Sequence, residues 1–266
     1  MLTWPLRRGQ RARQDPTSVE LARIASHPRH TELTSGVFGF PLVIPDGASF
    51  CSCYEEVFRN GIYAFEPATS RPFIVDAGAN IGLAVIYFTQ RFPSCEIVAI
   101  EADPRVFGVL AQNVRAAGYD NVELVNKALW ISEDGIDFFQ EGADAGRIPR
   151  SDDTPLGPRI HVSTVRLSSL LTRHVDFLKL DIEGAEVDVL NESAHLLKNV
   201  DHLFVEYHSF EKEPQRLDTL LTLLRDSGFR VYVQTAICPP RPFIERKPYL
   251  GMDLQLNIFA VRGAAA

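Results

Sequence analysis

The chain has 266 residues, a formal charge of −7 at pH 7, 45% hydrophobic residues and 23% charged residues. These values are close to globular averages, so they support a sizeable buried core and exclude wholesale disorder. Residues 1–30 hold six arginines against two acidic residues, a local charge of +4 that leaves −11 for the rest. An acidic body argues against extended nucleic-acid binding, which needs a basic face. We expect the basic start to be a solvated tail.

No stretch approaches the ~20 apolar residues that span a bilayer, and the first residues lack the apolar centre of a secretion signal. The sequence therefore predicts a cytoplasmic protein without a membrane span. Its four cysteines include no CxxC pair and lack the dense, even spacing of a disulfide scaffold.

The first part of the chain, residues 1–65, is predicted to be an N-terminal extension and cap. Asp15 and Pro16 are typical of a helix start, and they predict a helix over residues 16–25. Alternating residues 37–44 indicate a small hairpin, and Ser49 is the expected cap of a helix over residues 49–58.

Residues 66–266 are predicted to form the main domain. From Pro72 onward, short apolar runs alternate with amphipathic segments, which indicates βαβ units and a mostly parallel sheet. The predicted strands are 73–75, 96–100, 122–126, 176–180 and 202–206, and the predicted helices are 81–91, 104–117, 185–190 and 214–227. Residues 230–234 and 254–261 should close one edge as an antiparallel ribbon. Residues 135–158 are expected to form a strand near 136–139 and then a long loop.

The strongest motif is FIVDAGANIGLAVIYF, residues 73–88, in which a buried strand leads through a glycine-rich turn into an apolar helix. Gly78 permits the tight chain reversal, and Gly82 permits close approach of the helix or a ligand. A dinucleotide pyrophosphate would favour GxGxxG and no acidic group. Asp76 at the strand end instead suits the cationic amino group and sulfonium of S-adenosylmethionine, with Asn80 serving its carboxylate or ribose.

The next strand ends at Glu101, which is placed to accept hydrogen bonds from both hydroxyls of a ribose. NAD sites use the same device, so this residue does not discriminate between cofactors. Ala102 should lie beside an adenine, and Lys127 after the third strand should approach its other edge.

Charged residues also crowd the ends of two later strands. Lys179 and Asp181 should point to one side of the sheet, and Glu206 and His208 should stand beside Asp181 on the neighbouring strand. Buried charges on a central strand need partners, which favours a functional interpretation of Lys179 and Asp181. A solvated loop with a helix-capping glutamate explains Glu186 well, and His208 could equally be a surface histidine after a strand.

Together these motifs resemble the FkbM family of S-adenosylmethionine-dependent methyltransferases from about Pro72 to Phe229. The resemblance implies an α/β class I methyltransferase fold, Rossmann-like, with a seven-stranded sheet that is mostly parallel. It also implies O-methylation of a hydroxyl on a sugar, glycolipid or secondary metabolite. By position in the motifs, Asp76, Gly78, Asn80 and Glu101 look like cofactor residues, and Asp181 looks like the acidic residue between cofactor and acceptor.

We therefore expect a methyltransferase for a small-molecule or glycan acceptor, with His208, or Asp181 acting with Lys179, as proton acceptor. Asp181, Glu183, Glu206 and His208 could also converge on a divalent ion, for which oxygen ligands favour Mg or Mn. Two alternatives remain: a nicotinamide-dependent oxidoreductase, disfavoured by Asp76, and a non-enzymatic scaffold, disfavoured by the joint presence of Gly78, Asn80 and Glu101.

Overall fold

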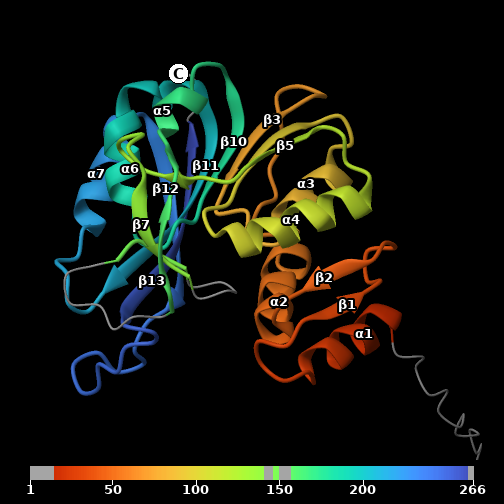
Figure 1. The fold of residues 1–266 in the computed structure, drawn as a ribbon. Helices are drawn as coiled ribbons and strands as arrows, with labels where there is room; N and C mark the ends of the chain where they lie inside the picture. Colours follow the sequence, from red (N-terminus) through yellow and green to blue (C-terminus); the bar gives the residue numbers. More distant parts are fainter. Residues whose placement is uncertain (1–14, 141–145, 150–156, 263–266) are drawn as a thin grey trace, which may run out of the picture.

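A seven-stranded sheet forms the centre of the protein, in the order β12-β13-β11-β10-β3-β4-β5 (Figure 1). The computed structural model describes residues 15–140, 146–149 and 157–262. The strands of this sheet are β3 (Phe73–Ala77), β4 (Glu96–Ile100), β5 (Val122–Val125), β10 (Val175–Leu180), β11 (Val200–Phe210), β12 (Phe229–Ile237) and β13 (Met252–Arg262). Strand β13 is antiparallel to both β11 and β12, and the other pairs are parallel. The predicted mostly parallel sheet with an antiparallel edge is confirmed.

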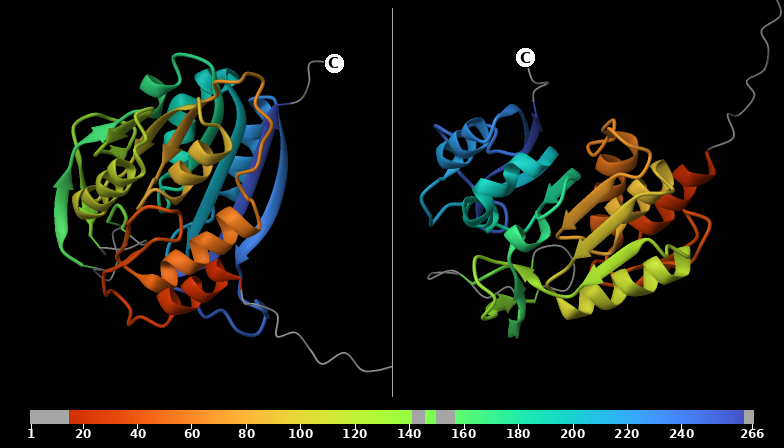
Figure 2. Two further views of the ribbon diagram at one scale, coloured as in Figure 1. Left: turned by 90° about the vertical axis from the view of Figure 1, so that its right-hand side faces the viewer. Right: turned by 90° about the horizontal axis from the view of Figure 1, so that it is seen from above.

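Helices cover both faces of the sheet, as the two views in Figure 2 show. One face carries α3 (Leu83–Arg91) and α4 (Pro104–Ala117), whose apolar sides pack on β3 and β4. The other face carries α5 (Leu167–Leu170), α6 (Glu186–Ser193), the 3-10 helix η2 (Ala194–Asn199) and α7 (Leu217–Asp226). This three-layer arrangement buries both faces of the parallel strands, which explains their near-continuous apolar sequences.

The predicted β4 and α4 match the observed bounds, whereas β11 is longer than predicted. We expected the strand to stop at Glu206, but it continues to Phe210. The reason is its pairing with β13, in which Glu206 is opposite Asn257 and His208 is opposite Gln255. Glu206 and His208 therefore lie within a strand and not in the loop after it.

The N-terminal part is built from α1 (Pro16–Ala25), the hairpin β1 (Leu33–Ser35) and β2 (Leu42–Ile44), α2 (Gly47–Tyr54) and the π-helix η1 (Glu55–Arg59). The predicted first helix is confirmed, with the Asp15 carboxylate accepting a hydrogen bond from the Ser18 N–H. The predicted cap of the next helix is wrong. Asp46, not Ser49, caps α2, because its carboxylate accepts hydrogen bonds from the N–H groups of Ala48 and Ser49.

This N-terminal part packs on α3 and α4 through a shared apolar cluster that includes Ile24, Phe50 and Ile86. At its centre is Asn113 of α4, which is 1% exposed. The Asn113 side chain accepts a hydrogen bond from the Val43 N–H at 2.8 Å and donates to the carbonyls of Val43 and Ile81, both at 3.0 Å. One side chain thus connects the edge of the hairpin to the turn after β3.

Two small ribbons lie beside the main sheet. The predicted strand at residues 136–139 is confirmed as β7 (Ile136–Phe139), and it pairs with β8 (Arg159–Val162), which was not predicted. A second ribbon joins β6 (Ala128–Leu129) to β9 (Thr164–Val165). Much of the predicted long loop, residues 141–145 and 150–156, lies outside the described residues, as does most of the arginine-rich start. Of the described helices, none has the length and apolar character to cross a bilayer.

Replacing Asn113 by alanine should destabilise the protein. The change leaves the Val43 N–H and two carbonyl groups without their buried partner, so we expect a loss of about 2–4 kcal/mol in the free energy of unfolding. Urea unfolding followed by circular dichroism measures this loss. Gln112→Ala, on the exposed side of the same helix, is the control and should change stability by less than about 0.5 kcal/mol. An Asn113→Ala protein as stable as the control would show that these hydrogen bonds do not hold the N-terminal part.

Candidate functional site

The carboxyl end of the sheet carries charged side chains on the face that α3 and α4 cover. On that face, Ile74, Phe177 and Phe204 belong to one apolar cluster. Because successive residues of a strand alternate between faces, the next residues on this side are charged. They are Asp76 on β3, Lys179 on β10 and Glu206 on β11. The core therefore changes from apolar to ionic within one step along each strand.

Lys179 connects these groups. Its ammonium donates a hydrogen bond to the Gly78 carbonyl at 2.7 Å and lies 3.4 Å from Asp76 Oδ1 and 3.2 Å from Asp181 Oδ2. The Lys179 side chain is 5% exposed. Burial alone would lower the pKa of Lys179, but Asp181 and Asp76 outweigh it and raise that pKa well above its ordinary value. Lys179 is thus a buried cation that joins β3 to β10.

Asp76 lies at the bottom of this arrangement. It is fully buried, and its two carboxylate oxygens accept no hydrogen bond from the described residues. Burial raises the pKa of Asp76 more than the neighbouring Lys179 lowers it. Asp76 contributes to the site as a buried counter-charge for the Lys179 ammonium.

The turn after β3 wraps closely around the end of β10. Gly78 has a φ of +81°, and a Cβ atom there would lie 1.8 Å from the Asp181 carbonyl oxygen, so no other residue fits. Asn80 and Glu183, in the turns that follow β3 and β10, also have left-handed backbone, with φ of 49° and 55°. Such values are uncommon outside glycine and often occur at functional sites.

Glu101 stands at the end of β4, facing this turn. Its carboxylate accepts hydrogen bonds from the N–H groups of Asn80 at 3.0 Å and Asp103 at 2.8 Å, one on each oxygen. Burial raises the pKa of Glu101 to about 7, although the two backbone hydrogen bonds act in the opposite direction. Each oxygen keeps a lone pair for a further donor, which suits the two hydroxyls of a ribose.

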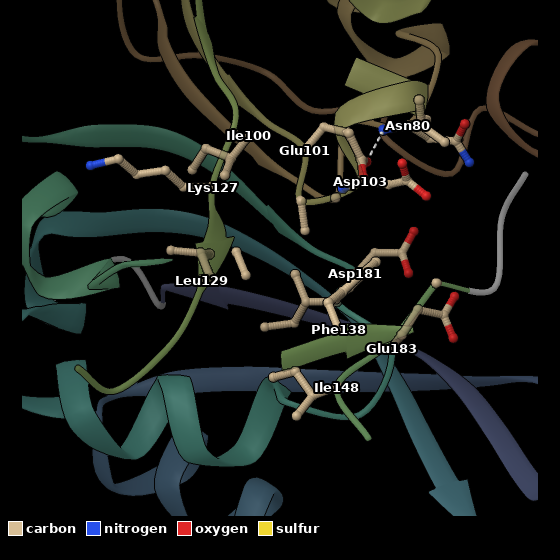
Figure 3. A pocket seen from close by; sticks show the side chains of 16 residues that line it. Asn80, Ile100, Glu101, Asp103, Lys127, Leu129, Phe138, Ile148, Asp181 and Glu183 are labelled. Carbon is tan, nitrogen blue, oxygen red and sulfur yellow. Dashed lines mark hydrogen bonds between the residues drawn. The ribbon is translucent and has the colours of Figure 1, made fainter. Parts of the chain in front are cut away.

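A first hollow of about 710 Å³ opens above Glu101, between the ends of β4, β6 and β10. Figure 3 shows its acidic side chains gathered on one side, and the Lys127 ammonium pointing away from them. The remaining wall is mostly apolar and includes Ala102, Leu129, Phe138 and Ile148. An acidic rim over an apolar slot favours a ligand that is cationic at one end and flat at the other.

A second hollow of about 600 Å³ adjoins the first, and the two share Gly78, Asn80 and Asp181. The second hollow lies between α2 and the turn after β3, and its lining is largely apolar, with Phe50 and Val57 among its walls. The Lys179 ammonium and the buried Tyr63 ring mark its inner end. An extended ligand that passes from one hollow to the other would pass beside the residues that line both, Gly78, Asn80 and Asp181.

His208 lies behind Asp181 and lines neither of these two hollows. Its side chain is 1% exposed, and Nδ1 is 2.9 Å from Oε1 of Glu186, which is equally buried. The carboxylate of Glu186 also accepts hydrogen bonds from the N–H groups of Ile182 and Gly184. Burial would lower the pKa of His208, but Glu183, Glu186 and Glu206 outweigh it and raise that pKa well above its ordinary value.

The predicted site residues thus fall into two groups, apart from Lys179, which lines the second hollow. One group lines the first hollow: Gly78, Asn80, Glu101, Ala102, Lys127 and Asp181. The other lies outside it: Asp76 beneath Lys179, Gly82 packed against Leu110 at the start of α3, and His208 behind Asp181. Their roles toward a ligand stay predictions.

Sequence reasoning missed the contact of Glu186 with His208 and the partial burial of Glu56 near Asp181. The solvated capping role considered for Glu186 does not hold, since its side chain is 1% exposed and contacts His208. Glu56 on η1 is half-buried, and burial together with nearby Asp181 raises the pKa of its carboxyl. The sequence around Glu186 does not predict this contact, because only the pairing of β10 with β11 brings His208 close to Glu186.

The order and directions of the strands are those of class I methyltransferases. The solved structure of methyltransferase FkbM from Methylobacillus flagellatus superposes with a TM-score of 0.50 at 16% identity, over 76% of this chain and 46% of that one. A family model described as the methyltransferase FkbM domain matches residues 76–231, more than half of the chain. The chain belongs to the FkbM methyltransferase family, and it is a methyltransferase.

Two relatives agree with this membership. Methyltransferase sdnD of Sordaria araneosa is 27% identical over 228 residues, which cover 71% of this chain and 86% of the relative. The 2-O-methyltransferase NoeI of Sinorhizobium fredii (strain NBRC 101917 / NGR234) is 26% identical over 160 residues, which cover 53% of this chain and 65% of that protein.

Lys179→Met should destabilise the protein strongly, because it leaves Asp76 buried without its cation. Breaking one side of a buried ion pair costs about 3–5 kcal/mol. Adding Asp76→Asn to this variant removes the uncompensated charge and should recover about 1–3 kcal/mol of that loss. Urea unfolding of wild type, both single variants and the double variant forms the complete cycle. If the two single losses simply add, Lys179 and Asp76 are not coupled and our description of the sheet end is wrong.

Proposed function

We propose that the protein transfers the methyl group of S-adenosylmethionine to a hydroxyl oxygen of a small-molecule acceptor. The observation that carries this proposal is the pair of hollows that meet at Asp181, one of which contains the Glu101 carboxylate. The nucleoside end of the cofactor fits the first hollow, and the amino-acid end fits the turn that both hollows share. The acceptor then approaches the same point from outside.

The residues present fit this cofactor. Each Glu101 oxygen has a lone pair left for a ribose hydroxyl, and the apolar wall that includes Ala102 and Leu129 suits the faces of an adenine. The bound cofactor supplies an activated methyl group on a cationic sulfur. Asp181 lines both hollows with a side chain that is 24% exposed, so it can face that positive charge.

The same charges disfavour a nicotinamide cofactor. Glu101, Asp103, Asp181 and Glu183 all line the first hollow and would repel a pyrophosphate (Figure 3). Lys179, the cation nearest to the turn, is already held by Asp76, Asp181 and the Gly78 carbonyl. A non-enzymatic scaffold is disfavoured as well, because it has no need for this number of costly buried charges at a strand end.

Asp181 is the group best placed to take the acceptor proton. Lys179 fixes one of its oxygens at 3.2 Å, and the carboxylate borders the space where the two hollows meet. His208, the other predicted proton acceptor, is buried behind Asp181 with Nδ1 directed at Glu186. The chain's main task is alignment, since holding two reactants at about 3–3.5 Å can lower a barrier by roughly 7–11 kcal/mol.

A hydroxyl of a sugar, glycolipid or secondary metabolite is the acceptor that we propose. The similarity to a 2-O-methyltransferase supports an oxygen acceptor. The largely apolar second hollow supports an acceptor of small-molecule size with an apolar face.

Glu101→Ala should weaken cofactor binding. Losing two charge-assisted hydrogen bonds should raise the Kd for S-adenosylhomocysteine at least about thirtyfold, measured by calorimetric titration. Glu96→Ala, which removes a half-exposed carboxylate at the opposite end of the same strand, is the matched control and should bind like wild type. NADH should not bind to either. Equal affinity of wild type and Glu101→Ala would place the nucleoside elsewhere.

The same titration should depend on pH. The carboxylate form of Glu101 accepts both ribose hydroxyls, and burial raises its pKa to about 7 in the free protein. Affinity should therefore fall as the pH decreases below this value, by up to about tenfold per pH unit. In Glu101→Gln this dependence should disappear, because the amide does not titrate. A wild-type affinity that stays constant between pH 5.5 and 7.5 would contradict this role of the Glu101 carboxylate.

Methyl-labelled S-adenosylmethionine and a panel of sugars, glycolipids and phenols test the reaction. The label should enter a base-stable ether, whereas a methyl ester would release labelled methanol in mild base. At saturating cofactor, Asp181→Asn should lower the transfer rate at least about 100-fold. Asp188→Asn, which loses only a half-exposed ion pair with Arg216, should keep the wild-type rate. A wild-type rate for Asp181→Asn would remove this residue from the reaction.

A further inference from the structure

Behind the shared end of the two hollows, β10 and β11 bring together three side chains with metal-binding atoms. In the register of β10 and β11, Lys179 lies opposite Phe204 and Leu180 lies opposite Val205. Asp181 and Glu206, the next residue of each strand, therefore lie side by side. His208 follows on the same face of β11. The ligand atoms of Asp181, Glu206 and His208 all lie within 4.8 Å of one another.

His208 is oriented as metal-binding histidines usually are. Its Nδ1 is 2.9 Å from the Glu186 carboxylate, which the N–H groups of Ile182 and Gly184 hold in place. A carboxylate behind a histidine fixes the ring and makes its other nitrogen a better ligand. Within the described part of the chain, Nε2 has no hydrogen-bond partner, although the side chain is only 1% exposed.

The distances around Nε2 fit an ion better than a direct contact. Oxygens of Glu206 and Glu183 lie 3.7 Å and 3.8 Å from Nε2. A direct N–H···O hydrogen bond would be about 2.7–3.2 Å long. Two ligand atoms that bind the same ion, each at about 2.1 Å, lie roughly 3–4.2 Å apart, depending on the ligand–ion–ligand angle. The spacing of these groups is compatible with one small cation, and the same Glu206 oxygen also accepts a hydrogen bond from the Gln255 side chain.

The charges point the same way. Asp181, Glu183 and Glu206 place three carboxylates around His208, and their side chains are 16–24% exposed, so an ion can reach them. Lys179 is already engaged by Asp76 and the Gly78 carbonyl as well as by Asp181.

We propose that Asp181, Glu206 and His208 form a binding site for one divalent cation of the magnesium–manganese class. Carboxylate oxygens with a single imidazole are the ligands that such ions accept, and softer metals would favour thiolates, which are absent from this cluster.

A second group, His174, Asp176 and Asp201, has similar spacing but a different construction. Asp176 Oδ2 accepts the Phe73 N–H at 2.8 Å, and His174 Nε2 is 3.3 Å from Asp201. The His174 side chain is 51% exposed. This group is a surface ion pair beside a structural carboxylate, and it provides a matched control.

A cation at this site would assist deprotonation of the acceptor hydroxyl, an inference that rests on the proposed function. A carboxylate is a weak base for an aliphatic hydroxyl, whose pKa is near that of bulk water, about 15.7. Coordination to a cation lowers the pKa of a hydroxyl bound to it. Asp181 could then accept the proton while the acceptor oxygen is held beside the shared end of the hollows.

Manganese binding to the full chain tests the site directly. Chelator-treated protein without cofactor is titrated with Mn²⁺, and free Mn²⁺ is followed by electron paramagnetic resonance. We expect one equivalent to bind, Mg²⁺ to compete for it, and Glu206→Gln and Asp181→Asn each to raise the Kd at least about tenfold. His174→Ala should bind Mn²⁺ like wild type. Circular dichroism of each variant checks that the fold is retained.

Wild type that binds no Mn²⁺, or Glu206→Gln and Asp181→Asn variants that are folded and bind it unchanged, would overturn the metal site. If only His174→Ala loses Mn²⁺ binding, the ion lies at the His174 group, and the proposed site is overturned as well. The cofactor titration is independent of this result. Protein that binds S-adenosylhomocysteine but not Mn²⁺ contradicts only the metal site. Protein that binds Mn²⁺ but not S-adenosylhomocysteine contradicts only the proposed function.

Discussion

The buried ammonium of Lys179 is the interaction on which the site depends. It joins Asp76 on β3, Asp181 after β10 and the Gly78 carbonyl in the turn between sheet and α3. These contacts hold together two strands whose ends form the two hollows. Since Lys179 is fully engaged, it leaves the surrounding acidic groups in excess. This excess of negative charge is the basis of the proposed preference for a cationic ligand over a phosphate-rich one.

The close fit of the backbone strengthens this arrangement. Gly78 approaches the Asp181 carbonyl so closely that a Cβ atom would collide with it, and this approach brings Asp181 beside the turn. Glu101 then fixes the same turn from the other side, through the N–H group of Asn80. Three strand ends thus determine the position of one short loop. Methyl transfer needs such precision, because the energetic gain comes mainly from alignment.

Local sequence patterns predicted the strands and helices that pass through the centre, such as β4 and α4, because each is flanked by clear turn and capping residues. They did not predict the length of β11 or the strand β8, which depend on pairing with segments far along the chain. In the site, the sequence correctly placed the glycine-rich turn after β3 and Glu101 at the end of β4, and their roles toward a ligand stay predictions. The contact of Glu186 with His208 was not predicted, since it arises only when β11 continues past Glu206.

The most direct test is a crystal structure of the protein with S-adenosylhomocysteine. We expect both ribose hydroxyls at the Glu101 carboxylate, the adenine between Ala102 and Leu129, and the sulfur atom nearest to Asp181 where the two hollows meet. A ribose that does not contact Glu101, or a sulfur directed away from Asp181, would contradict the site as we describe it.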